Sequence, residues 1–219
     1  MNKHKICFIV CTNNDTFSSE CLNYLYRLAI PTGFSVEILT IKDASSMLSG
    51  YREGCLSTDA LYKVFLHHDV FILNTRFIEN MLEIFDYDAN IGMIGMAGVK
   101  RMPDDFIMWN VHRAGNLFAG QRPADYSSDI YSLHNDGYEE VEAIDGLLMA
   151  IKGDPILRED IFDGWDFYDV SISYEMRKTG RKIVVPNQPV PWCLHDDGNL
   201  LSMLNYDHYR KLAIKEYAG

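Results

Sequence analysis

Short, mostly apolar runs alternate with helical patterns along the first hundred residues, and this alternation constrains the fold more than any other feature. Residues 6–11, 36–41 and 62–66 have the length and composition of strands buried on both faces. Residues 18–28 and 47–61 lie between them and carry apolar residues at helical spacing, the second with an interruption at Gly54. This order predicts a parallel sheet with right-handed crossover helices.

Each of the three predicted strands ends in a polar loop, at residues 12–15, 42–46 and 67–69. The carboxyl ends of parallel strands meet at one edge of the sheet, and α/β folds of this type bind their ligands there. We therefore expect the three loops to converge on one site.

The rest of the chain has weaker patterns. Residues 98–140 hold several Gly, two Pro and scattered aromatic residues. We interpret them as a long functional loop region with short strands, suited to an acceptor groove; the alternative is an insertion with no role. Further elements are expected at 70–73 (extended), 77–85 (helix), 91–97 (strand), 140–151 (strand broken at Asp145-Gly146), 170–178 (helix), 182–185 (strand) and 200–217 (helical).

Charge, cysteine content and the short apolar run near the amino end limit the partners and the cellular location that we expect. The formal net charge is -11, and so acidic a surface repels nucleic-acid backbones and anionic lipid. The five Cys form no CxxC pair, which argues against a disulfide framework and for a reducing compartment. The apolar run near the amino end is too short for a signal peptide or a membrane span. We therefore expect a cytoplasmic protein with no nucleic-acid partner.

Common phosphate-binding and nucleophile motifs are missing. Neither GxxxxGK[ST] nor GxSxG occurs, and no GxGxxG follows the first predicted strand. A diphosphate bound at this sheet edge would therefore depend on a metal ion.

The triplet His67-His68-Asp69 lies between two apolar runs at the end of the third predicted strand. A polar triplet at such a place is costly unless it has partners. Asp69 could bind a divalent cation that bridges the two phosphates of a nucleotide sugar. The alternative is that Asp69 caps the following turn and that the two His only pack.

A third His, His195, precedes Asp196 and lies far along the chain from Asp69, so the fold alone could bring them together. His combined with Asp suits a Mn²⁺-like ion, which accepts nitrogen as well as oxygen ligands. Alternatively, His195 is a loop residue beside the turn made by Asp197-Gly198.

Two further acidic residues are candidates. Asp169 lies where a helix should begin, so it is either the N-cap or a general base that deprotonates an acceptor hydroxyl. Burial beside a substrate can raise the pKa of such a carboxyl towards the working range. Asp145, followed by Gly146 inside an apolar run, either holds an acceptor hydroxyl or makes a turn.

Six segments together resemble the bacterial glycosyltransferase-like branch of the family 2 GT-A glycosyltransferases. They are 11–15 (CTNND), 51–54 (YREG), 67–70 (HHDV), 144–150 (IDGLLMA), 165–169 (WDFYD) and 192–196 (WCLHD). The resemblance covers nearly the whole chain. It implies a single α/β domain of GT-A fold, with a mixed, mostly parallel central sheet flanked by helices. Residues 1–97 would bind the nucleotide sugar, and 98–219 the acceptor.

The resemblance also implies roles for individual residues. Asp69 and His195 would be the metal ligands, and His67 would lie near the donor ribose. Asp169 matches the usual base of inverting members, and Asp145 matches an acceptor-side position. The remaining substrate-binding candidates are Cys11, Thr12, Asn13 and Asp43, at positions that hold the nucleotide base, and Trp165, in the same motif as Asp169.

Three positions depart from the family pattern. His67 stands where the first Asp of the metal motif is usual, and Tyr168 stands where Glu is usual. Arg52 replaces an expected Asn, and it could instead bind donor phosphate through its guanidinium.

We therefore expect an inverting, metal-dependent transfer of sugar from a UDP-sugar-like donor to a hydroxyl of a carbohydrate or glycolipid, with Mn²⁺ or Mg²⁺ as cofactor. One alternative is a catalytically inactive nucleotide- or sugar-binding module on the same fold. Another is a sugar nucleotidyltransferase, but residues 12–19 lack the Gly and basic residues that it would need. The sequence gives no indication of the oligomeric state.

Overall fold

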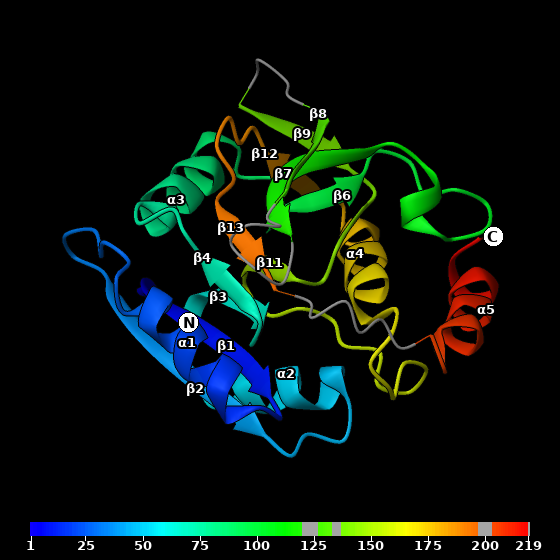
Figure 1. Ribbon diagram of the computed structural model, residues 1–219, viewed down its shortest axis with the longest axis horizontal. Coiled ribbons are helices and arrows are strands. Elements are labelled where there is room, and N and C mark those ends of the chain that lie inside the picture. The colour runs from blue at the N-terminus through cyan, green and yellow to red at the C-terminus, as the bar shows by residue number, and fades with distance from the viewer. Residues whose placement is uncertain (120–126, 133–136, 197–202, 219) are drawn as a thin grey trace.

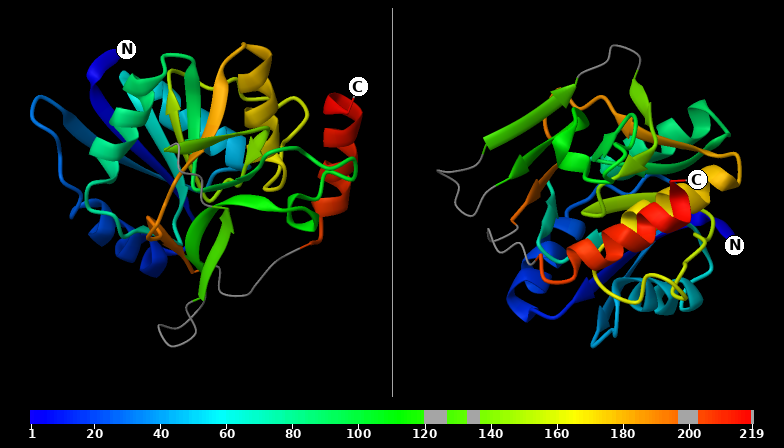
Figure 2. Two further views of the ribbon diagram at one scale, coloured as in Figure 1. Left: turned by 90° about the horizontal axis from the view of Figure 1, so that it is seen from above. Right: turned by 90° about the vertical axis from the view of Figure 1, so that its right-hand side faces the viewer.

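The computed structural model describes residues 1–119, 127–132, 137–196 and 203–218, with the backbone alone for residues 127–132. Two β-sheets form its centre, and helices pack against both faces of the larger one (Figure 1, Figure 2). Within these ranges no helix is long and apolar enough to cross a membrane. All five cysteines are free thiols, and four of them are buried.

The larger sheet has seven strands in the order β2-β1-β3-β11-β5-β12-β9. Their bounds are β1 Asn2–Thr12, β2 Ser35–Lys42, β3 Ala60–His67, β5 Ile91–Gly95, β9 Tyr138–Val141, β11 Leu148–Lys152 and β12 Lys182–Pro186. β1, β2, β3, β5 and β12 run in one direction, and β9 and β11 run against them. The sheet is mixed and mostly parallel, as predicted.

Helices cover both faces of this sheet. They are α1 Asp15–Leu25, α2 Met47–Leu56, α3 Phe77–Tyr87, α4 Tyr168–Lys178 and α5 Tyr206–Tyr217. Successive residues of β1 point to opposite faces. Cys7 and Ile9 join the apolar cluster that contains residues of α2, α4 and α5, whereas Phe8 joins the cluster that contains residues of α1 and α3. The run in β1 is therefore buried on both faces, as its composition predicted. The same expectation is wrong for residues 36–41, because β2 is the edge strand of this sheet and most of its residues are only partly buried.

The predicted interruption at Gly54 is wrong. This glycine lies inside the single helix α2. A Cβ at Gly54 would lie 2.6 Å from Cγ2 of Ile9 on β1, so the missing side chain lets the helix approach the sheet closely. The glycine marks close packing rather than a helix break.

A second, six-stranded sheet combines short strands from residues 98–140, where short strands were expected, with strands from outside that region, and this pairing was not predicted. Its order is β10-β6-β7-β13-β4, and β8 pairs with β7. The bounds are β4 Val70–Ile72, β6 Ala97–Val99, β7 Arg113–Ala119, β8 Ser127–Ser132, β10 Ala143–Ile144 and β13 Cys193–His195, with a short 3₁₀ turn, η1, at Met108–Asn110. β13 runs antiparallel to β4 with His195 opposite Val70. This pairing brings His195 next to Asp69 across the sheet.

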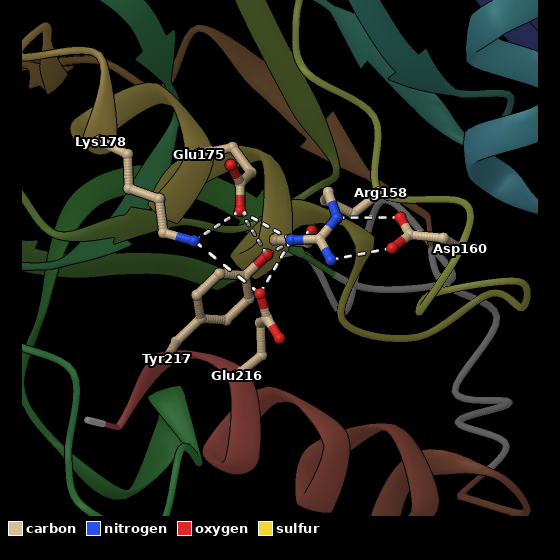
Figure 3. A network of polar contacts seen from close by, with 7 residues as sticks. Arg158, Asp160, Glu175, Lys178, Glu216 and Tyr217 are labelled. Carbon is tan, nitrogen blue, oxygen red and sulfur yellow. Dashed lines mark hydrogen bonds and ion pairs between the residues drawn. The ribbon is translucent and has the colours of Figure 1, made fainter.

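A network of ion pairs joins α5 to α4 (Figure 3). Arg158 lies at its centre, with Nη1 2.8 Å from Glu216 Oε1 and 3.4 Å from Glu175 Oε1, and Nη2 2.9 Å from Asp160 Oδ2. Lys178 and Tyr217 also donate hydrogen bonds to Glu175. Every carboxylate of this network faces at least one cation.

Candidate functional site

A cavity of about 530 Å³ opens at the carboxyl ends of β1, β2 and β3. It is lined by Cys11, Thr12, Asn13, Ile41, Asp43, Ala44, Met47, His67, His68, Asp69 and Trp165. Seven of the residues predicted to bind donor or metal are among them. The convergence of the three polar loops at one sheet edge is therefore confirmed.

The register of the parallel strands places these loops side by side. Cys11 on β1 pairs with His67 on β3, and Thr12 pairs with Lys42 on β2. The chain turns sharply after β2, because Asp43 adopts a left-handed conformation with φ 56°. Such a conformation costs a non-glycine residue energy and is common at functional sites.

His67 and Asp69 line this cavity, and His195, which does not line it, lies beside them. Each offers one ligand atom, and the three atoms lie within 4.8 Å of one another. Asp69 Oδ1 is 3.9 Å from His67 Nδ1 and 3.7 Å from His195 Nε2. The backbone also joins the two strands here, since the amide of Asp196 donates a hydrogen bond to the carbonyl of Asp69. His195 thus meets Asp69 through the fold, as the prediction required.

These three side chains fit a divalent cation. Asp69 Oδ1 is buried and has no hydrogen-bond partner among the described residues, which is costly for a carboxylate oxygen unless a cation binds it. Ligand atoms that share one ion at about 2.1 Å lie about 3 to 4 Å apart, so the separations around Asp69 match a shared ion better than direct hydrogen bonds. Two imidazole nitrogens and one carboxylate oxygen form a donor set that suits Mn²⁺.

His67 and His68 have different surroundings. Burial lowers the pKa of His67 to about 4, although the charge of Asp69 opposes this shift. His67 is therefore neutral at physiological pH, as a ligand must be. His68 instead stacks on Phe17, with ring centroids 5.7 Å apart. The alternative of a merely packed His describes His68 but not His67.

Asp169 lies in the first turn of α4 and is not its N-cap. The cap position is Phe167, which has φ 61° and makes no capping hydrogen bond through its side chain. The Asp169 carboxylate accepts hydrogen bonds from the amides of Gly146 and Val170, at 2.9 and 2.8 Å. The N-cap alternative for this residue is therefore wrong.

The electrostatic surroundings of Asp169 suit a base. Burial raises its pKa to about 7, and the nearby charge of Asp145 adds to the shift, while the hydrogen bonds from Val170 and Gly146 oppose it. Among the described residues, no Lys or Arg pairs with Asp145 or Asp169. A carboxyl with such a pKa can accept a proton near neutral pH.

Tyr168, the residue before Asp169, connects this acid to the three candidate metal ligands. Its hydroxyl forms a hydrogen bond with His67 Nε2. The main chain links the same parts, because the amide of Leu147 donates to Asp145 Oδ1 and the amide of His67 donates to the carbonyl of Leu147. Asp145, Asp169 and the three candidate ligands thus belong to one connected site.

Arg52 is not brought to this cavity. Its Nε lies 2.8 Å from Glu159 Oε1 at the surface, and the residue is absent from the cavity lining. Sequence reasoning in turn missed His67 as a third possible metal ligand and Tyr168 as its partner. The signal for both was present: each stands where the resemblance expects an acidic residue.

Comparisons with known proteins agree with this fold. A family model described as "Glycosyltransferase like family" matches residues 7–217. No curated protein sequence matches the chain.

Solved structures share the fold at low sequence identity. S. aureus TarS 1–349 in complex with UDP-GlcNAc matches with a TM-score of 0.58 and 11% identity, over 95% of this chain and 65% of that one. Another crystal structure of S. aureus TarS gives 0.57 and 11%, over 95% of this chain and 39% of that one. The mannosyltransferase PcManGT from Pyrobaculum calidifontis, in complex with GDP-Man and Mn²⁺, gives 0.51 and 15%, over 96% of this chain and 61% of that one. The chain thus spans less than two thirds of the length of these proteins.

Proposed function

This chain belongs to the glycosyltransferase-like family, and from that premise we propose that it transfers a sugar, with inversion, from a UDP-sugar-like donor to a hydroxyl of a carbohydrate or glycolipid. This membership supports the enzyme class predicted from the sequence, a glycosyltransferase. Donor, acceptor, stereochemistry and metal dependence are the proposal.

One observation carries the proposal. The cavity at the carboxyl ends of β1, β2 and β3 has the candidate ligand Asp69 in its wall, and a carboxyl group suited to act as a base is connected to it through Tyr168 and His67. Transfer from a nucleotide sugar needs a binding site for the diphosphate. It also needs a base beside the acceptor hydroxyl that attacks the anomeric carbon. Nucleotide sugars are bound by TarS and by the mannosyltransferase that share the fold.

Asp69, His195 and His67 would hold a Mn²⁺ or Mg²⁺ ion. Bound there, such an ion would offset the negative charge that develops on the departing diphosphate. The surrounding loops would hold the rest of the donor, with Cys11, Asn13 and Asp43 at the nucleotide base. Trp165 contributes an apolar wall to the same cavity, and its side chain is 51% exposed.

Asp169 would act on the acceptor. It accepts the proton of the acceptor hydroxyl as that oxygen forms a bond to the anomeric carbon, while the bond from this carbon to the diphosphate oxygen breaks and its electron pair leaves with the diphosphate. Attack from the face opposite the leaving group inverts the configuration. Asp145 supports this step because its charge helps to keep the pKa of Asp169 near neutrality.

Aromatic rings beside Asp169 would receive the acceptor. Tyr206 on α5 packs between Phe167 and the exposed Trp109, at centroid distances of 4.9 and 5.0 Å. Phe167, which Tyr206 contacts, is two residues before Asp169 in the chain, and the charge of Asp169 adds to the effect of burial in raising the pKa of Tyr206. Rings with an apolar face and a polar edge suit sugar rings, which have both kinds of surface.

A binding screen tests the donor part of the proposal. The purified chain is melted with a panel of nucleotides and nucleotide sugars, each with Mn²⁺ and with a chelator. A ligand at about a hundred times its Kd stabilises by about 2.7 kcal/mol, which raises the Tm of a chain this size by about 5 to 10 °C. We expect this shift for one UDP-sugar with Mn²⁺ and its loss in the Asp69→Ala variant.

Turnover tests the rest. The preferred donor is incubated with carbohydrate acceptors, and the anomeric configuration of the product is read by NMR. Equal donor affinity with and without metal would contradict the metal assignment. A product that retains the donor configuration would contradict the role of Asp169 as the base of a single displacement.

A further inference from the structure

The hydroxyl of Tyr168 contacts a metal-ligand candidate from outside the cluster. Tyr168 is buried, with 5% of its surface exposed, and its hydroxyl is hydrogen-bonded to Nε2 of His67. The other ring nitrogen of His67, Nδ1, faces Asp69 Oδ1 at 3.9 Å. One nitrogen of the His67 imidazole therefore contacts Tyr168, and the other faces the candidate metal ligand Asp69.

This division has a chemical consequence. A neutral imidazole carries its proton on one nitrogen only, and only the other nitrogen can bind a cation. A partner at Nε2 that accepts a hydrogen bond keeps the proton on Nε2 and leaves the lone pair of Nδ1 free. The hydroxyl oxygen of Tyr168 can be that partner.

We propose that Tyr168 is a positioning residue, which holds His67 in the Nε2-protonated tautomer with Nδ1 turned towards Asp69 and His195. The inference rests on the proposed function, because it assigns a task to the same site. It goes beyond that function by giving a defined role to a tyrosine that contacts neither donor nor acceptor in the proposal.

Gly146 and Tyr51 fix the position of the Tyr168 ring. A Cβ on Gly146 would lie 2.5 Å from Cζ of Tyr168 and still closer to its hydroxyl oxygen, so no larger residue fits without moving the tyrosine. On another side, the fully buried ring of Tyr51 meets the ring of Tyr168 edge-on, at a centroid distance of 5.8 Å and an interplanar angle of 81°. A ring held in this way has little freedom to release His67.

The chain contains a matched control for this arrangement. Tyr209 on α5 donates a hydrogen bond to Asp163 at 2.9 Å. Gly164 packs against the Tyr209 ring, because a Cβ there would lie 2.5 Å from its Cζ. The pair therefore has the same glycine-tyrosine packing and a comparable hydrogen bond, but Tyr209 contacts none of the three candidate ligands.

Binding of Mn²⁺ alone gives the first test. Isothermal titration of the parent chain is compared with Tyr168→Phe, Gly146→Ala and the controls Tyr209→Phe and Gly164→Ala. Loss of an outer partner of a metal-bound His typically weakens binding by about 10- to 100-fold. We expect this loss in Tyr168→Phe and Gly146→Ala and parent-like affinity in both controls. Parent-like affinity in a folded Tyr168→Phe would overturn the inference.

The tautomer itself gives a second test, which needs no metal and no turnover. Proton–nitrogen correlation NMR at neutral pH identifies the His67 signals by their absence in His67→Gln. We expect the Nε2-protonated pattern in the parent and a mixture of tautomers in Tyr168→Phe, but not in Tyr209→Phe. An unchanged pattern in Tyr168→Phe would overturn the inference even if the parent transfers sugar. A changed pattern would support it even if no donor is turned over.

Discussion

The two ends of α4 carry acidic clusters that are neutralised in different ways. At the carboxyl end, Glu175 meets Arg158, Lys178 and the hydroxyl of Tyr217, all at 3.4 Å or less. At the amino end, Asp169 lies near Asp145, and its carboxylate accepts hydrogen bonds from the backbone amides of Gly146 and Val170. Within the described part of the chain, the same helix thus carries one carboxylate that is paired with cations and one that is not.

The pKa values of these acids follow their partners. Burial alone would raise the pKa of Glu175, but the hydrogen bonds of Lys178 and Tyr217 and the charges of Lys178 and Arg158 hold it below its usual value. Burial raises the pKa of Asp169 to about 7, and no cation among the described residues compensates. Carboxyl groups with a strongly raised pKa are common at functional sites, which agrees with the role that we propose for Asp169.

The largest effect should follow from Asp169→Asn. Removal of an essential base typically lowers the rate by about 10² to 10⁴, so we expect a loss of that size in kcat with donor binding unchanged. The free energy of unfolding, by contrast, should not fall in this variant. The pKa of Asp169 is about 7 in the folded state against an ordinary 3.8, so this group destabilises the fold progressively as pH rises from about 4 to 7, and fully above 7.

Melting at pH 8 separates this change from damage to the fold. The Asp169→Asn variant, which cannot ionise, should melt at or above the Tm of the parent there, and the difference should vanish near pH 4. A variant that melts well below the parent at pH 8 would show that the carboxylate is a structural group like Glu175.

At the carboxyl end of α4, a substitution should lower stability and leave turnover unchanged. Arg158→Met removes one of the two cations that Glu175 and Glu216 share, since Lys178 also lies 2.9 and 4.0 Å from them. Because the guanidinium is partly exposed, we expect this loss to cost about 2 to 4 kcal/mol of unfolding free energy. For a chain of this size that lowers the Tm by about 4 to 16 °C. Turnover per folded molecule should stay at the parent value. A kcat loss without a Tm loss would place the network in the catalytic machinery.

Sequence reasoning reached most of the fold because local pattern decides it. β1, β2, β3 and the helices between them follow from apolar periodicity alone. The smaller sheet did not, because short strands such as β6, β10 and β13 pair over long sequence distances and have little periodicity of their own.

Some residues of the candidate site could also be predicted from the sequence, and others could not. The strand-end loops with Cys11, Asp43 and Asp69 were predictable, since parallel topology alone brings them together. The role proposed for Tyr168 was not predictable. Its contact with His67 depends on the missing side chain of Gly146 and on the left-handed conformation of Phe167 at the start of α4. Such contacts are set by three-dimensional packing, which a linear pattern does not contain.

A smaller effect should follow from Asp145→Asn, which alters the unpaired end without removing its base. Asp169 accepts a proton only when it is deprotonated, so transfer by the parent should fall as pH drops below about 7. Without the charge of Asp145, the pKa of Asp169 falls, and the midpoint of this decline should move to lower pH by about one unit. The pH profile of kcat at saturating donor and metal measures the shift. An unchanged midpoint would mean that burial alone sets the pKa.

The smallest effect concerns Arg52, for which the resemblance and the structure lead to different expectations. Its ion pair with Glu159 is exposed, with side-chain exposures of 60% and 29%, and such pairs contribute about 0.2 to 1 kcal/mol. Because Arg52 does not line the cavity, Arg52→Gln should change neither donor affinity nor kcat by more than about twofold. Glu159→Gln is the matched control, since it removes the same pair from the other side. A tenfold loss of donor affinity in Arg52→Gln alone would mean that the guanidinium leaves Glu159 for the donor phosphate, and a charged group outside the cavity would then have to be counted as part of the site.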